Sequence, residues 1–395
     1  MAERADLEAA ASAGVINAAQ VGPLFDFLAT RKAAGPRPTV SGEEDLRFIR
    51  NFHDVFLAVG IALFSIGMAV AIATYAGDNA ANPQQGTITA GVGCLIAVAL
   101  VWALGEFFAR RRRLFLPAIA IVISLTVFAV FAAALLYTGA LIGRGFEGNV
   151  ANFESIPPEI RNGTLLATVL AVIAPLAFYF RFRLPFSLGL AGAGAALFVI
   201  VACLIANFEL TVQFLPSLYL LLGILLFIAG VLFDARDPSR ATRFSDNGFW
   251  LHFAAAPLIL NGAFGLVVQA FNGGNTAASV NAALMSGVGE NNPAVAAQAA
   301  VTLAVILLIG VISLLINRRA LIVSALLTTG IAIGVLFNAA GLGEGALVAS
   351  ILIVLGAFVL ILGASWHVAR RALLAWVKPG GLWARIFPPE IGAPA

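Results

Sequence analysis

The sequence predicts an all-α membrane protein, a polytopic bundle of about ten transmembrane helices. Of the 395 residues, 61% are hydrophobic and only 11% are charged, and the mean hydropathy is +0.98. Ordinary soluble domains carry roughly 25% charged residues, so this composition is not that of a water-exposed surface. The apolar residues also fall in continuous runs, which indicate helices rather than the alternating strands of a barrel.

The apolar runs divide the chain into predicted spans. Each run is close to the roughly 20 residues that a helix needs to cross the hydrocarbon core, although the fourth is shorter. In chain order the predicted spans are 54–76, 87–108, 115–142, 164–180, 185–206, 210–233, 249–271, 295–316, 320–341 and 346–367.

Polar segments flank the predicted membrane domain of residues 41–368. Residues 1–40 are expected to form a cytoplasmic helical appendage followed by a linker that contains Pro and Gly. They have no early apolar core of the kind found in signal peptides, so we expect them to remain on the mature protein. Residues 369–395 mix Trp376 and Trp383 with Arg and Lys, which is typical of a tail at the membrane interface.

Basic residues predict the orientation of the bundle. Cytoplasmic connections are enriched in Lys and Arg. If the N-terminus is cytoplasmic, all 23 Lys and Arg residues except Arg144 and Arg161 fall on the cytoplasmic side. One missed or extra helix would reverse every later connection and destroy this pattern. We therefore expect both termini in the cytoplasm.

Residues 181–237 and 317–371 suggest an internal repeat. In both segments a basic pair precedes a helix that contains a Gly at the same spacing, Gly194 or Gly330. Each helix is followed by a short outer turn with one acidic residue. This correspondence predicts that helices 3–6 and 7–10 are four-helix units repeated in parallel. The alternative is a chance likeness between apolar hairpins.

Neutral polar residues inside the spans are candidate substrate-facing groups. No Lys, Arg, Asp or Glu lies near the middle of a predicted span, which argues against a proton relay or a carboxylate-coupled pump. Asn261 follows Pro257 by one helical turn, and Pro removes a helix hydrogen bond. Routine packing between helices through amide hydrogen bonds is the alternative. The substrate-facing candidates are Asn261, Pro257, Asn338 and Gln269.

The three histidines lie near the cytoplasmic ends of predicted helices. His53 and Asp54 begin the first span, His252 lies on the seventh, and His367 ends the tenth. Imidazole and carboxylate groups together could bind a divalent metal or sense cytoplasmic pH. No pair has the spacing of a metal motif, and no cofactor is indicated. The alternative is ordinary salt bridging at the interface, such as Glu106 with Arg110.

Three stretches carry a resemblance to a known class of protein. They are the prefix that starts at Leu7, the entry Glu44-Asp-Leu-Arg-Phe-Ile-Arg-Asn-Phe-His-Asp, and the opening of the seventh helix from Asp246 to Pro257. Together they resemble uncharacterised bacterial multi-pass inner-membrane proteins of unknown function. The resemblance implies a location in the bacterial inner membrane and implies no activity.

The sequence therefore leaves three functions open. The first is transport or binding of a neutral or amphipathic small molecule or lipid. The second is a membrane scaffold or sensor that does not transport. The third is a membrane-embedded enzyme that uses the histidine and carboxylate groups at the cytoplasmic face. Membrane lipids are the expected partners, and the basic residues need no nucleic-acid partner to explain them.

Overall fold

The structure is a computed structural model of the chain. It describes residues 4–26, 52–145, 157–237, 243–271, 293–316 and 368–375, with isolated residues between 349 and 360. The chain divides into a unit of residues 1–43 with 390–395 and a unit of residues 44–389, and each is considered by itself. Every regular element in the described ranges is helical, which confirms the predicted all-α class.

In the first unit, residues 4–26 form short helical segments joined by a turn. α1 (Arg4–Ser12) is followed by Gly14, whose φ of 75° is the left-handed conformation that commonly ends a helix. Asn17 caps η1 (Ala18–Gln20), because its side chain accepts the Ala19 N–H while the Gln20 side chain accepts the Asn17 N–H. Short helices were predicted in this region, and the predicted linker lies outside the described residues.

Seven helices of the second unit are long and apolar enough to cross a membrane, judged by length and composition over the described residues. They match the first seven predicted spans in order, and α12 matches the eighth. Spans 320–341 and 346–367 lie outside the described residues apart from isolated positions, so the number ten and the repeat stay predictions. The helices are α3 (Phe52–Asp78), α4 (Pro83–Gly105), α5 (Phe115–Ile142), α6 (Pro158–Phe182), α7 (Pro185–Ala206), the short α8 (Phe208–Gln213), α9 (Leu215–Arg236), α10 (Arg243–Phe271) and α12 (Pro293–Ile316).

Prolines in the first turn set where several of these helices begin. α4 starts at Pro83, and the side chain of the preceding Asn82 caps it. α6 starts at Pro158 and α7 at Pro185. Pro fits this position because its fixed φ is already helical and the N–H that it lacks would have no partner there. α6 is therefore longer than the predicted span 164–180, which followed the apolar run alone.

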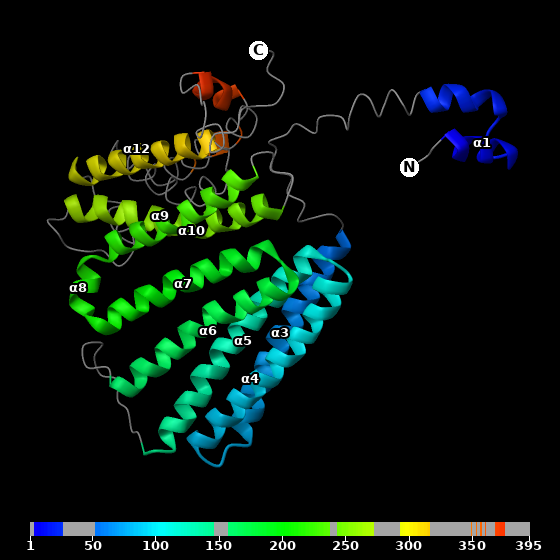
Figure 1. Cartoon of the computed structure of the whole chain (residues 1–395). Helices are drawn as coiled ribbons and strands as arrows, with labels where there is room; N and C mark the ends of the chain where they lie inside the picture. The colour runs from blue at the N-terminus through cyan, green and yellow to red at the C-terminus, as the bar shows by residue number, and fades with distance from the viewer. Residues whose placement is uncertain are drawn as a thin grey trace. The chain divides into compact units, whose positions relative to one another are not determined.

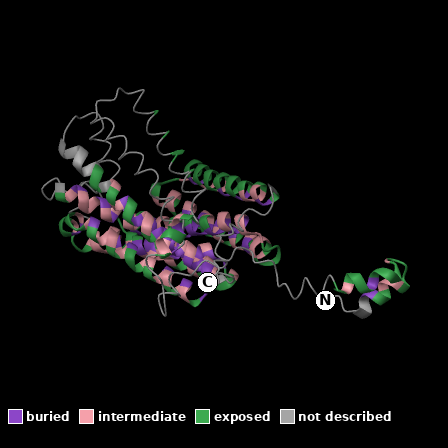
Figure 2. Cartoon of the chain, turned by 90° about the horizontal axis from the view of Figure 1, so that it is seen from above, coloured by how far each residue is buried: buried purple, intermediate pink, exposed green. Residues whose placement is uncertain are grey.

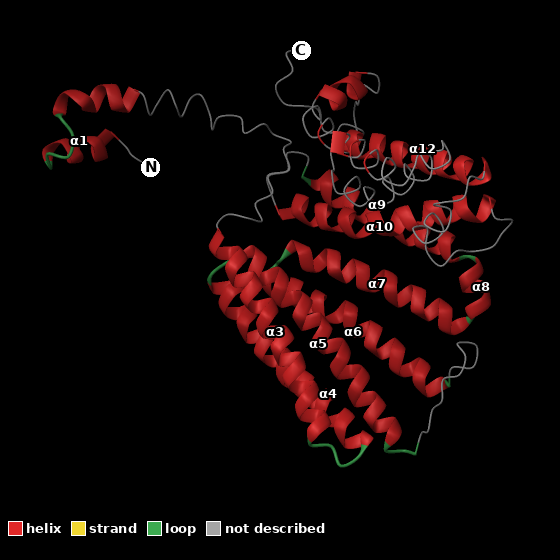
Figure 3. Cartoon of the chain, turned by 180° about the vertical axis from the view of Figure 1, so that it is seen from behind, coloured by secondary structure: helices red, strands yellow, loops and turns green. Residues whose placement is uncertain are grey.

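The helices of the second unit pack as a row (Figure 1). α3 and α4 pack on α5, α5 on α6, α6 on α7, and α7 on α10, while α9 and α12 also pack on α10. α10 thus separates α7 from most of α9, although α9 precedes it in the sequence. α3 and α10, the first and seventh predicted spans, lie at separate places in the row, as the view from behind also shows (Figure 3).

Apolar side chains fill the spaces between the helices and also cover their outward faces. The larger core cluster joins α3 to α6, and its members Ala97, Val101, Ile121 and Phe178 have no exposed surface. Many outward residues are exposed and apolar, such as Leu63 on α3, and Figure 2 shows exposed residues along the outer sides of the helices. Apolar surface of this extent is out of place in water and is expected where lipid surrounds a helix.

Glycines bring α9 and α10 closer together than larger residues would allow. A Cβ added at Gly223 of α9 would lie 2.7 Å from the backbone N of Ile259, and one added at Gly262 of α10 would lie 2.7 Å from the Cα of Leu220. Both distances are shorter than real Cβ contacts. The partner residues run in opposite directions along the two helices, so α9 and α10 form a close antiparallel pair of the small-residue type common in membranes.

Three basic regions lie at one end of the second unit, which we call the basic end. α4 continues into a π-helical turn, η2 (Glu106–Arg111), that leads to α5. The second region connects α6 to α7, and the third is the start of α10. Residues from all three line one pocket. Two predicted spans separate each of these regions from the next. Their proximity therefore agrees with the prediction that successive connections lie on alternate sides of the bundle.

Candidate functional site

A pocket of about 300 Å³ lies at the basic end, between η2 and the first turns of α5, α7 and α10. Its floor and walls are partly apolar, from residues at the starts of α5 and α7. Its described charged residues come from three separate parts of the chain, and four of these five are arginines. The charged lining residues are Arg110, Arg113, Arg181, Arg183 and Asp246.

Two helix N-termini contribute to the same pocket. Leu114 and Leu184 are the residues that precede α5 and α7, both line the pocket, and neither caps its helix with a side chain. The first turn of a helix has backbone N–H groups without intrahelical acceptors and carries a partial positive charge. Helix starts and arginines therefore add to the same positive potential, and the pocket is suited to an anion.

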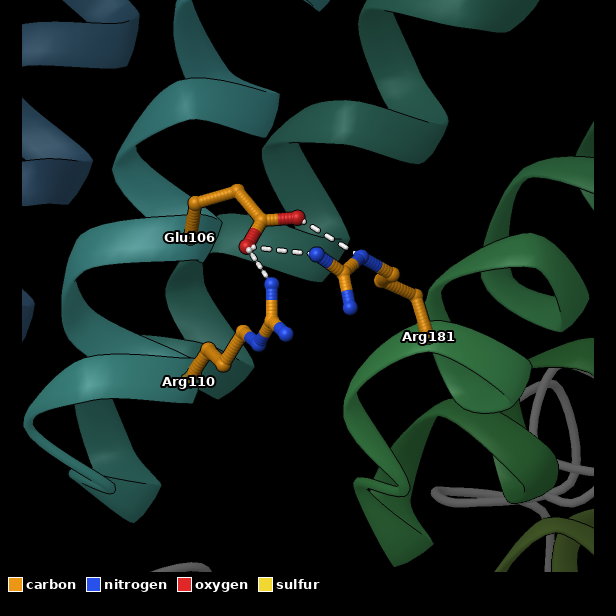
Figure 4. A network of polar contacts seen from close by, with 3 residues as sticks. All are labelled: Glu106, Arg110 and Arg181. Atoms are coloured by element: carbon orange, nitrogen blue, oxygen red, sulfur yellow. Dashed lines mark hydrogen bonds and ion pairs between the residues drawn. The ribbon is translucent and has the colours of Figure 1, made fainter.

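Glu106 fixes two of the four arginines. Its Oε1 accepts a hydrogen bond from Nε of Arg181 at 2.7 Å, and its Oε2 accepts from Nη2 of Arg181 at 3.0 Å and from Nη1 of Arg110 at 3.2 Å (Figure 4). The structure contains the Glu106–Arg110 salt bridge, which the sequence offered as the alternative to a metal or pH-sensing group. The bidentate bond to Arg181 was not predicted, and it links η2 to the end of α6. Because the arginine side chains are exposed and the Glu106 side chain is one-third exposed, we assign these bonds a positioning role rather than a large contribution to stability.

Arg113 and Arg183 have an unusual backbone. Their φ values are 55° and 56°, and they are the only non-glycine residues with positive φ in the described part of the chain. The left-handed region costs an ordinary L-residue about 1–2 kcal/mol, and Gly is the residue that occupies it without this penalty. Both strained residues line the pocket. Such outliers often occur at functional sites.

A hydrogen bond ties the start of α10 to α6 beside the pocket. The buried Asn247 donates from Nδ2 to the hydroxyl oxygen of Tyr179 at 2.9 Å. Asp246 is its chain neighbour and lines the pocket. The bond therefore helps to hold Asp246, the acidic residue among the described lining residues, at its place in the wall.

The predicted substrate-facing residues that the structure describes do not line this pocket. Asn261 donates from Nδ2 to the carbonyl oxygen of Pro257, one turn earlier on the same helix, at 2.7 Å. Its amide is thus used within α10, and Pro257, another of the predicted candidates, supplies the acceptor. Gln269 donates from Nε2 to the carbonyl oxygen of Gln213 at 3.2 Å and so joins α10 to α8. Asn338 lies outside the described residues.

The predicted histidine and carboxylate candidates do not form one cluster in the described part of the chain. His53 is exposed and Asp54 is buried at the start of α3, which packs on α4 and α5. His252 lies on α10, which packs on α7, α9 and α12. Among the described residues no group of three or more His, Cys, Asp and Glu could hold a metal ion. His367 lies outside those residues, so its place in such a group stays untested.

His252 instead pairs with Asp234 inside the unit. Its Nε2 lies 3.1 Å from Oδ2 of Asp234 on α9, and neither side chain is more than 7% exposed. The ring packs on Phe227, with centroids 4.7 Å apart, and Gly230 leaves the space for it. A fully buried imidazole cannot reach a substrate in this arrangement, so we assign the pair to the joint between α9 and α10.

The sequence contained the arginines of the pocket but did not show that they converge. The basic residues predicted the orientation of the bundle. Because they concentrate in every second connection, they indicated that these arginines share one side of the membrane, but not that they meet in one pocket. Comparisons with family models, with curated proteins and with solved structures gave no match. The site must therefore be interpreted from its own chemistry.

Proposed function

We propose that this chain is a bacterial inner-membrane protein, with both termini in the cytoplasm, that binds the acidic headgroup of an amphipathic molecule. The arginine-lined pocket is the observation that carries this proposal. Guanidinium groups bind carboxylate and phosphate through paired hydrogen bonds. The basic end, on this orientation, lies level with the acidic headgroups of the cytoplasmic leaflet.

The lining of the pocket narrows the predicted ligand class. A neutral solute would leave the net positive charge of this lining unmatched, whereas an acidic headgroup would match it. The outward faces of the spanning helices are apolar. Such faces suit a ligand whose headgroup lies in the pocket and whose acyl chain lies along a helix. Binding is what these features support; no described feature indicates that the ligand crosses the membrane.

The binding experiment uses the full chain in mild detergent. Native mass spectrometry would compare phosphatidylglycerol with phosphatidylcholine for the unsubstituted protein and for an Arg113→Gly, Arg183→Gly double variant. We expect the unsubstituted protein to prefer phosphatidylglycerol, and the double variant to bind it at least about tenfold more weakly, because two charge-assisted contacts are lost.

Glycine is chosen in this variant because it suits the left-handed backbone at both positions. The double variant should therefore fold at least as well as the unsubstituted protein, so weaker binding cannot be attributed to unfolding. Arg112→Gln is the matched control, since Arg112 belongs to the same connection and does not line the pocket. Equal affinity of all three proteins for phosphatidylglycerol would refute the proposal.

The proposed orientation has its own test. Ala81 lies in the exposed connection between α3 and α4, and Arg112 is exposed at the basic end. In intact cells, a membrane-impermeant thiol reagent should label Ala81→Cys and should label Arg112→Cys only after the membrane is permeabilised. The unsubstituted protein, which retains Cys94 and Cys203, gives the background. Labelling in the reverse pattern would overturn the orientation.

A further inference from the structure

We infer that the pocket is selective for a phosphate monoester, a group that carries nearly two negative charges, over a phosphodiester that carries one. This inference rests on the proposed headgroup binding and specifies its chemical class. The evidence is the charge balance of the pocket, the state of its arginines and its size.

The charge balance favours a dianion. The described lining holds four guanidinium groups and the carboxylate of Asp246, and Glu106 adds a second carboxylate by bonding to Arg110 and Arg181. Four positive charges less two negative charges leave +2. A phosphate monoester carries about −1.5 to −2 near neutral pH. A phosphodiester would leave one unit of this positive charge unmatched.

The arginines divide into a fixed pair and an available pair. Arg110 and Arg181 bond to Glu106, which orients them and takes part of their hydrogen-bonding capacity. In the described part of the chain, the side chains of Arg113 and Arg183 have no hydrogen bond or ion pair. Arg113 lies two residues before Phe115, where α5 begins, and Arg183 lies two residues before Pro185, where α7 begins. Each arginine therefore sits beside a positive helix start.

A terminal phosphate matches this arrangement better than a bridging phosphate does. A monoester presents three equivalent oxygen atoms, so separate donors from the η2–α5 and the α6–α7 connections can each bind one. A diester presents two such oxygens and must extend a substituent on its other side. The volume of about 300 Å³ is at the lower limit of small-molecule pockets, which suits a headgroup and not a whole lipid.

The same chemistry occurs on a lipid and on a soluble compound, so the test compares both. Affinities of the detergent-solubilised full chain would be measured by microscale thermophoresis for dioctanoyl phosphatidic acid, dioctanoyl phosphatidylglycerol and glycerol 3-phosphate. We expect phosphatidic acid to bind at least about tenfold more tightly than phosphatidylglycerol, and the preference to disappear in the Arg113→Gly, Arg183→Gly variant. Arg112→Gln should retain the preference.

The outcomes separate this inference from the proposed function. Equal, arginine-dependent affinity for phosphatidic acid and phosphatidylglycerol would overturn monoester selectivity and leave headgroup binding intact. Binding of either lipid that is unchanged in the double variant would overturn both. If glycerol 3-phosphate binds as tightly as phosphatidic acid, the monoester assignment holds, and the ligand is a soluble phosphate ester rather than a lipid.

Discussion

Gly262→Ala, a gain of one methyl group in the middle of α10, is expected to destabilise the protein severely. The added Cβ would lie 2.7 Å from the Cα of Leu220, and a backbone atom cannot rotate away as a side chain can. Either α9 and α10 separate or the backbone distorts. Overpacking of this kind typically costs about 1–3 kcal/mol, and a clash with backbone belongs at the upper end. The measurement is thermal unfolding in detergent, followed by Trp fluorescence and by size-exclusion chromatography.

Gly67→Ala is the matched control. Gly67 lies within α3, and a Cβ added there meets no atom within 4 Å in the described structure. Because Ala favours the helix over Gly by about 1 kcal/mol, this variant should be as stable as the unsubstituted protein or more so. Equal melting of the two alanine variants would show that α9 and α10 do not approach as closely as the structure has them.

Asp234→Ala is expected to have the second large effect. The substitution leaves His252 fully buried without the carboxylate 3.1 Å from its Nε2, and it opens a space between α9 and α10. Removing one partner of a buried hydrogen bond costs about 1–3 kcal/mol, and more where the remaining group is charged, since that group keeps its desolvation penalty. The expected result is a loss of folded, monodisperse protein, measured by the same unfolding and chromatography experiments.

Two further variants show what the Asp234–His252 pair contributes. Asp234→Asn keeps the shape and one oxygen acceptor, so its stability should lie between those of the alanine variant and the unsubstituted protein. His53→Ala removes the exposed histidine of α3 and should change stability little. If Asp234→Ala unfolds at the same temperature as His53→Ala, the buried contact is not a stabilising feature of the fold.

The boundaries of the spans show what the sequence could predict. The predicted spans 115–142 and 185–206 coincide with α5 and α7, because arginines and Pro185 mark sharp ends to their apolar runs. The span 164–180 was too short at its start, because polar residues after Pro158 continue the helix beyond the apolar core. Apolar length predicts which part of a helix lies in lipid, whereas caps and prolines decide where the helix begins.

The candidate site was harder to predict, since it depends on contacts between distant segments. Arg181 and Glu106 are 75 residues apart, and no periodicity in the sequence relates them. Asn261 was predicted to face a substrate or bridge two helices, and the structure shows its amide bonded within its own helix. The spacing of residues does not show whether such a side chain bonds one turn back along its own helix or to a neighbouring helix.

The distribution of the pocket along the chain has a consequence for how the protein is made. The four arginines in the described lining of the pocket, and both helix starts beside them, lie within residues 110–185, and the described residues after these add only Asp246 to the charged lining. A ribosome that has released residues up to the first turn of α7 has therefore already produced nearly all of the charged lining that the structure describes. During synthesis this site would be more positive than in the finished protein, because Asp246 is not yet in place. An acidic lipid could hold the first helices together at that stage, before α9 and α10 are inserted.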